Sequence, residues 1–280
     1  MTVETIDQNP SRPQTRMRDV AKWVLWRTLP ESAYQKLLAR TKAKDFQSGL
    51  FREPELDLIP LLLEEGGTAV DVGANHGMWT LALSERAGAG GRVLAFEPVP
   101  FTFGTLEALT ARLDLGNVRL ENVGCSDETG TFEMVIPAQD VGSSDDLQAH
   151  LSARDELGEA DGETVACEVV RLDDAAADLE SIDFMKLDIE GAELKALTGA
   201  RGVIGRHLPA IVCEVNQEFL EGFGQSADEL FGYMKGFGYH AFHYKGDMRL
   251  DPLDSLDSIH HSNVVFIPED RLDRVRGLIS

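Results

Sequence analysis

The residues best placed to do chemistry stand in the run VDVGANHG, from Val70 to Gly77. An apolar segment ends there in a glycine loop, and Gly73 and Gly77 allow a tight turn and the close approach of a ligand to the backbone. A dinucleotide loop needs the pattern G-x-G-x-x-G, but Asn75 replaces the middle glycine. Asp71 adds a carboxylate, and an unpaired anion repels a diphosphate. The run therefore favours a ligand with a cationic amino group and no phosphate.

A second acid follows at the end of the next apolar run. Glu97 lies 20 residues after Gly77 and is followed by Pro98. This is the usual place for an acid that accepts hydrogen bonds from both ribose hydroxyls. Ser126 and Asp127 follow a third run and are expected at the edge of an adenine. S-adenosylmethionine, which carries an amino-acid end and a sulfonium, suits this set of groups.

Charged residues also follow two later apolar runs. In the sequence KLDIEG, Lys186, Asp188 and Glu190 alternate, so they share one face if the strand continues that far. Glu214 and Asn216 alternate in the same way at the end of the following strand. Three charges in an otherwise apolar strand indicate a role beyond packing. Lys186, Asp188, Glu190 and Glu214 are therefore the candidate catalytic groups.

Two mechanisms fit these residues. In the first, Asp188 or Glu214 is the general base that deprotonates an acceptor hydroxyl, and Lys186 pairs with one of them. In the second, Asp188, Glu214 and Asn216 hold a divalent ion such as Mg²⁺, which lowers the pKa of the acceptor. A structural ion pair without a catalytic role is the third interpretation. Further candidates for a base are His243, His260 and His261.

Short β-rich apolar runs alternate with helical stretches from residue 68 onward, which is typical of βαβ units and a parallel sheet. The pattern predicts a doubly wound α/β sheet of about seven strands. The expected strands are 68–72, 92–96, 118–123, 184–188, 210–215, 239–244 and 264–267. The expected helices are 78–87, 101–113, 193–200 and 227–236. Residues 131–136 and 164–172 read as two further strands around an acidic insertion.

Five motifs in order resemble the FkbM family of S-adenosylmethionine-dependent methyltransferases: DVGANHGMWT, AFEPVPFTFGTLEAL, NVGCSDETG, FMKLDIEGAELKALTGA and PAIVCEVN. The resemblance extends from about Phe51 to Pro268. It implies a class I methyltransferase, Rossmann-like sheet with its last strand antiparallel, and methyl transfer to a hydroxyl of a sugar or secondary metabolite. The cofactor-binding residues expected on this basis are Asp71, Gly73, Ala74, Asn75, Gly77, Glu97, Pro98, Ser126 and Asp127.

The chain divides into five expected parts. Residues 1–16 are expected to be a disordered tail, and residues 17–48 a helical cover, with a membrane-surface anchor as the alternative. Residues 49–270 form the methyltransferase domain. Within it, residues 138–163 are an acidic insertion, either a lid or a solvated loop. Residues 271–280 are a C-terminal helix or tail.

The net charge of −22 disfavours binding to nucleic acid or anionic lipid. Residues 1–48 hold nine basic and five acidic groups, whereas residues 49–280 hold 17 and 43. This asymmetry suggests that the N-terminal segment lies across the acidic body and closes the acceptor pocket. The three cysteines show no metal or redox spacing and are expected to be reduced core residues. Without an apolar leader or spanning segment, the expected location is the cytoplasm.

The expected function is transfer of a methyl group from S-adenosylmethionine to a hydroxyl oxygen of a small molecule or glycan. N-methylation by the same fold and a non-catalytic protein that binds S-adenosylmethionine are the alternatives. A nicotinamide-dependent oxidoreductase is disfavoured by Asp71 and the incomplete glycine pattern. Partners other than the acceptor are not expected, apart from further copies of the chain.

Overall fold

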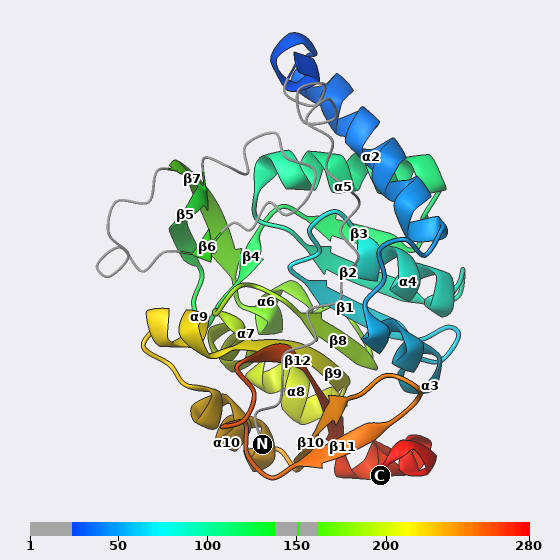
Figure 1. Cartoon of the computed structure of the whole chain (residues 1–280), viewed down its shortest axis with the longest axis vertical. Helices are drawn as coiled ribbons and strands as arrows, with labels where there is room; N and C mark the ends of the chain where they lie inside the picture. Colours follow the sequence, from blue (N-terminus) through cyan, green and yellow to red (C-terminus); the bar gives the residue numbers. More distant parts are fainter. Residues whose placement is uncertain (1–23, 138–149, 152–161) are drawn as a thin grey trace, which may run out of the picture.

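Eight strands form the central sheet of the computed structural model, which describes residues 24–137, 150–151 and 162–280 (Figure 1). Their order is β11-β10-β12-β9-β8-β1-β2-β3. Strands β1, β2, β3, β8 and β9 run parallel to their neighbours in that group, whereas β12 is antiparallel to both β9 and β10. The strands are β1 Thr68–Val72, β2 Arg92–Phe96, β3 Val118–Glu121, β8 Phe184–Leu187, β9 Ala210–Asn216, β10 Tyr239–Tyr244, β11 Leu250–Leu253 and β12 His261–Pro268.

The class I methyltransferase topology and its antiparallel last strand are confirmed by this order. The predicted number of strands is corrected from seven to eight, because β11 pairs antiparallel with β10 at the edge of the sheet. This strand has four residues and contains Pro252, which has no N–H for a ladder. An edge position tolerates that proline, but its sequence gives no strand pattern.

Helices cover both faces of the sheet (Figure 1). One face carries α3 (Ile59–Leu62), α4 (Met78–Ala87) and α5 (Pro100–Leu113). The other face carries α6 to α10. These are α6 Leu172–Ala175, α7 Glu193–Gly199, α8 Arg201–His207, α9 Gln217–Gly222 and α10 Ala227–Gly236. The 3₁₀ helices are η1 Pro54–Leu58, η2 Glu269–Arg274 and η3 Arg276–Leu278, the last two in the segment expected to be a C-terminal helix or tail.

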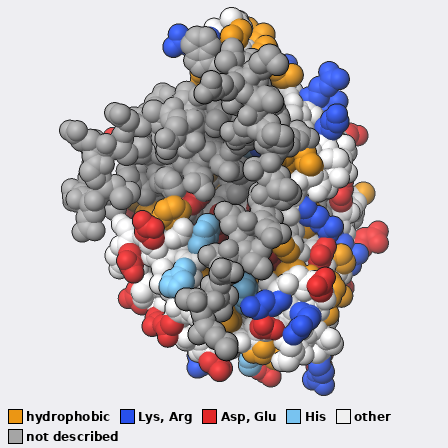
Figure 2. Space-filling model, in the orientation of Figure 1, with side chains coloured by type: hydrophobic (Ala, Val, Ile, Leu, Met, Phe, Trp, Pro, Cys, Tyr) orange, Lys and Arg blue, Asp and Glu red, His pale blue; other side chains and the backbone are white. Residues whose placement is uncertain are grey.

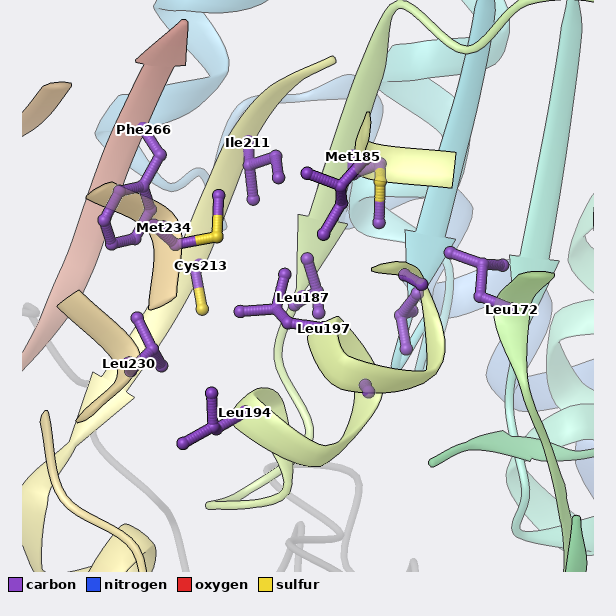
Figure 3. Close-up of a cluster of buried hydrophobic side chains, with 14 of the residues drawn as sticks. Leu172, Met185, Leu187, Leu194, Leu197, Ile211, Cys213, Leu230, Met234 and Phe266 are labelled. Carbon is purple, nitrogen blue, oxygen red and sulfur yellow. The ribbon is translucent and has the colours of Figure 1, made fainter. Parts of the chain in front are cut away.

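The alternation of side chains along each strand divides the core into two layers. On β8 and β9, Met185, Leu187, Ile211 and Cys213 face the helices α7 and α10, where Figure 3 shows them beside Leu194, Leu197, Leu230 and Met234. Phe184, Ala210 and Val212 face the opposite layer with Trp79. Because the central strands β1, β8 and β9 are covered on both faces, their residues are almost all buried.

A second, smaller sheet contains the two further strands that the sequence predicted around the acidic insertion. Strands β4 (Gly124–Cys125), β7 (Gly162–Val170), β5 (Gly130–Pro137) and β6 (His150–Leu151) form it in that order. Most of the acidic insertion 138–163 lies outside the described residues, so the structure does not test the lid. All three cysteines are buried and free, as expected for reduced core residues.

The N-terminal segment packs on α5. Helix α2 (Glu31–Gln47) lies along α5 (Figure 1) and buries Ala39 and Ala43 against Leu109. Residues 24–28 are also helical, and the tail 1–16 with the start of the expected helical cover lies outside the described residues. No helix within the described part of the chain combines the length and apolar character needed to cross a membrane.

Candidate functional site

A cavity of about 340 Å³ opens at the carboxyl edge of the parallel strands. Its described walls come from three regions: the β1–α4 loop with the end of β2, the small sheet, and the ends of β8 and β9. The wall is completed by Lys42, Phe46, Phe51 and Glu53. These residues belong to the described part of the chain before β1, residues 24–67, which we call the N-terminal segment from here on. The volume is within the range of small-molecule sites.

The glycine loop between β1 and α4 lines one end of the cavity with Gly73, Ala74 and Asn75. Gly73 has a φ of 83°, and a Cβ there would lie 1.9 Å from the backbone oxygen of Asp188. Gly77 does not line the cavity; it is the left-handed N-cap of α4, with a φ of 92°. The first glycine thus permits close packing of two loops, and the second permits the helix to begin.

Glu97 holds the loop from the end of β2. Its Oε2 accepts a hydrogen bond from the Asn75 N–H at 2.9 Å, and its Oε1 accepts one from the Val99 N–H at 2.9 Å. Burial raises the pKa of Glu97 to about 7, although both backbone hydrogen bonds oppose the rise. Each carboxylate oxygen keeps a free lone pair, so Glu97 can still accept hydroxyl hydrogen bonds from a ligand.

Asp71 lies beneath the loop rather than in the cavity, which corrects the expectation that it meets the ligand. Its side chain is 1% exposed, and its Oδ2 accepts a hydrogen bond from Thr80 Oγ1 at 2.6 Å. Burial raises the pKa of Asp71 to about 7. Asp71 is one residue before the end of β1, and its side chain faces α4. Its hydrogen bond with Thr80 therefore connects β1 to α4.

Ser126 and Asp127 also do not line the cavity; Ser126 is buried and donates its hydroxyl hydrogen bond to Asp127. The wall expected from them is supplied by neighbouring apolar groups. These are Pro98, Val99, Gly124, Cys125, Met134 and Val169. On this side the cavity is lined by Gly124 and Cys125 of the small strand β4, one or two residues before Ser126 and Asp127.

At the other end of the cavity, β8 ends at Leu187, earlier than the alternation predicted. Lys186 is 1% exposed, and its Nζ lies 3.5 Å from Asp188 Oδ2 and 2.6 Å from Asn263 Oδ1. Burial would lower the pKa of Lys186, but the carboxylates of Asp188 and Glu53 raise it above its usual value. Lys186 is therefore a charged ammonium beneath the cavity, while Asp188 lines it.

Asp188, Glu190 and Glu214 come together although the strand does not carry Glu190. One carboxylate oxygen from each lies within 4.8 Å of the others. Burial, Glu214 and Asp188 raise the pKa of Glu190 to about 8. Glu214 accepts a hydrogen bond from His261 Nε2 at 2.8 Å, which raises the pKa of His261. We refer to Asp188, Glu190 and Glu214 as the carboxylate cluster.

Asn216, expected from the sequence as a metal ligand, does not line the cavity and is engaged in the start of a helix. Its side-chain oxygen accepts a hydrogen bond from the Phe219 N–H at 3.3 Å, and it is the N-cap of α9. Asparagine at the end of a strand is also a preferred N-cap residue. Glu190 takes the third position, since its left-handed backbone, with a φ of 55°, turns the loop back toward Glu214.

Two residues of the site were not found by sequence analysis. Glu53 reaches the cavity from the segment before η1, and no motif marks it. Glu193 is buried, and its Oε1 accepts hydrogen bonds from the N–H groups of Ile189 and Gly191, so it fixes the loop that carries Glu190. The string D-I-E-G-A-E showed an acid three residues after Glu190, but it gave no sign that the acid turns back onto the loop.

A family model described as "Methyltransferase FkbM domain" matches residues 71–241, which include the glycine loop, Glu97 and the carboxylate cluster. The chain belongs to the FkbM methyltransferase family. It is therefore a methyltransferase, and its expected resemblance to this family is confirmed. The match begins at Asp71 and ends in β10, so the N-terminal wall of the cavity lies outside it.

This FkbM methyltransferase is 28% identical over 201 residues to 31-O-demethyl-FK506 methyltransferase FkbM of Streptomyces tacrolimicus, covering 63% of this chain and 74% of that protein. It is also 28% identical over 208 residues to AMB antimetabolite synthetase AmbE of Pseudomonas aeruginosa. This match covers 64% of this chain but only 10% of that protein. A crystal structure titled Methyltransferase FkbM from Methylobacillus flagellatus KT is 19% identical, with a TM-score of 0.45, and covers 89% of this chain and 58% of that one.

Proposed function

We propose that this FkbM methyltransferase transfers a methyl group from S-adenosylmethionine to a hydroxyl oxygen of a small molecule or glycan. The observation that carries the proposal is a single cavity with Glu97 at one end and the carboxylate cluster at the other. The first end suits a nucleoside without phosphates, and the second suits removal of a proton.

The donor end fits S-adenosylmethionine by its chemistry. Glu97 has free lone pairs for ribose hydroxyls, the apolar residues around Cys125 suit an adenine ring, and the Gly73 loop allows close approach. The bound donor supplies a methyl group on a sulfonium. The chain's own task is to bind the donor, align the acceptor with it and exclude water.

The acceptor end supports O-methylation because an alcohol must lose its proton as the new bond forms. The carboxylate cluster lines this end, and burial together with neighbouring carboxylates raises the pKa of Glu190 and of Glu214, which makes both better proton acceptors than exposed acids. Lys186 balances part of the cluster's charge through Asp188. A relative named for O-demethyl-FK506 methylation is consistent with a hydroxyl acceptor in a secondary metabolite.

A divalent ion such as Mg²⁺ is the second candidate for activating the acceptor. The carboxylate cluster offers three hard oxygen ligands within 4.8 Å of one another, which fits such an ion. Asp188, Glu190 and Glu214 would hold it, and it would lower the pKa of an acceptor hydroxyl. Titration of the protein with Mg²⁺ in a calorimeter tests this candidate; an absence of heat in wild type and in Glu190→Gln alike would count against it.

We further propose that the acceptor is not a nucleic acid, since the chain carries a net charge of −22. A screen with methyl-labelled donor against sugars, aromatic alcohols, amines and ribosomal RNA tests this proposal. Labelling of a sugar or an aromatic alcohol without labelling of ribosomal RNA supports it, and labelling of ribosomal RNA would overturn it. Labelling of an amine would favour N-methylation, and binding of donor without any product across the screen would favour the non-catalytic alternative.

The first experiment is isothermal titration with S-adenosylhomocysteine. Glu97→Ala should weaken binding by about 1–3 kcal/mol, the value of a lost charge-assisted hydrogen bond. Glu107→Ala, an exposed acid on α5, is the matched control and should bind as wild type does. A folded wild-type protein that does not bind S-adenosylhomocysteine would overturn the proposed donor.

A further inference from the structure

Glu53 is held in the wall of the cavity by two neutral donors from distant parts of the chain. Its Oε2 accepts hydrogen bonds from Trp79 Nε1 at 2.9 Å and from Asn263 Nδ2 at 3.2 Å. Trp79 belongs to α4 and Asn263 to β12, so the N-terminal segment is fixed to both halves of the site. The side chain of Glu53 remains 29% exposed and lines the cavity.

The cation beneath the cavity does not neutralise this wall. Lys186 Nζ lies 3.9 Å from Glu53 Oε2 and 3.5 Å from Asp188 Oδ2, so two carboxylates share one ammonium. Glu214 adds a further carboxylate, partly offset by His261, and Lys42 is a cation in the same cavity wall. The resulting negative potential favours a cationic group of a ligand at this end.

The donor proposed above carries such a group, the ammonium of its amino-acid end. The sequence assigned that ammonium to Asp71, but Asp71 is enclosed under the loop and does not reach the cavity. Glu53 does reach it. Both hydrogen bonds that the described residues donate to Glu53 go to Oε2, so Oε1 retains its capacity to accept from a ligand.

We infer that Glu53 binds the α-ammonium group of the methyl donor, as a cofactor-binding residue contributed by the N-terminal segment. The inference rests on the proposed function, because it concerns the same donor. It gives that segment a direct part in donor binding. Asp188, which also lies near Lys186 and lines the cavity, is the second carboxylate available to the same ammonium.

The test is calorimetric titration of the full chain, in buffer with a chelator, with two ligands. One is S-adenosylhomocysteine, and the other is its desamino analogue, which keeps the carboxylate and lacks the amino group. Glu53→Gln keeps the size of the side chain and an oxygen acceptor for Trp79. It should weaken S-adenosylhomocysteine about tenfold or more, as expected for a lost charge-assisted hydrogen bond, and leave the affinity of the analogue unchanged.

Asp57→Asn is the matched control, since Asp57 lies on η1 and pairs with Arg52. It should leave the affinities of both ligands unchanged. Equal weakening of both ligands by Glu53→Gln would overturn the inference and show a structural role, and no weakening of either would also overturn it. If wild type binds neither ligand, the proposed donor itself fails, which is a separate outcome.

If Glu53→Gln does not fold, Glu53→Asp provides the second variant. It keeps a negative charge near Lys186 but withdraws the carboxylate by one methylene. The inference then predicts selective weakening of S-adenosylhomocysteine relative to the analogue. Equal affinity losses for the two ligands in this variant would again contradict it.

Discussion

Two buried carboxylates in this protein differ in role because one lines the cavity and the other lies beneath the loop between β1 and α4. Asp71 lies near the end of β1 and Glu97 directly follows β2; both are buried, but only Glu97 lines the cavity. The pKa of each is raised to about 7, primarily by burial. Burial of the charged form costs free energy in both cases. Glu97 is buried where it lines the cavity, whereas Asp71 is buried where it accepts a hydrogen bond from Thr80.

Asp71→Asn should therefore stabilise the free protein at high pH. The pKa of Asp71 rises from 3.8 unfolded to about 7 folded, so its contribution to stability falls as pH rises through that window. The advantage of the variant in melting temperature should be smallest near pH 4 and largest near pH 8, growing by about 2–4 °C for each kcal/mol gained. Thermal scans from pH 4 to 8 check this.

The exposed Asp270→Asn serves as the control in these scans and should show no widening difference from wild type. A variant Asp71→Asn that is less stable than wild type at pH 8 would show that the charged hydrogen bond to Thr80 outweighs the cost of burial.

At the scale of elements, the site depends on two loops that touch through backbone atoms. The loop after β1 passes so close to the loop after β8 that no side chain fits between Gly73 and the carbonyl of Asp188. Glu97 fixes the first loop through the N–H of Asn75, and Glu193 fixes the second through the N–H groups of Ile189 and Gly191. The relative position of donor end and carboxylate cluster follows from this contact.

Gly73→Ala should consequently destabilise the protein by at least about 2 kcal/mol, because the new methyl group clashes with backbone and the residue keeps a positive φ. Urea unfolding measures the loss, and calorimetry should show weakened S-adenosylhomocysteine binding. Gly116→Ala is the control, since a Cβ there meets nothing within 4 Å. Near-wild-type stability of Gly73→Ala would show that the two loops separate easily.

At the scale of the whole molecule, opposite charge suggested how the N-terminal segment docks, but the contacts of α2 with α5 are mainly apolar, together with a hydrogen bond from Gln35 Nε2 to the carbonyl of Phe101. Helix α2 buries Tyr34, Leu38, Ala39 and Ala43, while its other face is exposed. Tyr34 also packs with Phe101 of α5, with ring centroids 6.2 Å apart. Figure 2 shows acidic and basic side chains mixed over the described surface on its visible face. Packing of small and aromatic residues is thus the larger contribution to docking.

Substitutions in α2 should separate the two contributions. Ala39→Glu places a charge in a 1% exposed position and should lower the melting temperature equally at low and high salt. Lys36, Arg40 and Lys44 all lie on the exposed face of α2. Changing all three to Gln should have little effect on the melting temperature at low salt or at high salt. A loss of stability in the triple variant only at low salt would instead support electrostatic docking.

The sequence by itself determined the features that depend on neighbouring residues. Hydrophobic periodicity placed β1, β2, α4 and α10 at their observed bounds, because these elements bury a regular face and begin or end at glycine, proline or a capping box. It also placed Glu97 and the acids 188, 190 and 214 at one edge of the sheet, since parallel strands end together.

The tertiary structure decided which of these groups meet. Whether Asp71 faces the cavity, whether Asn216 caps a helix, and whether Glu190 turns back to Glu214 depend on loop conformations. Glu53 reaches Asn263 across 210 positions of the chain. Such contacts arise when the whole core packs, and no local periodicity encodes them. The cofactor motif was therefore readable from the sequence, whereas the wall contributed by the N-terminal segment required the fold.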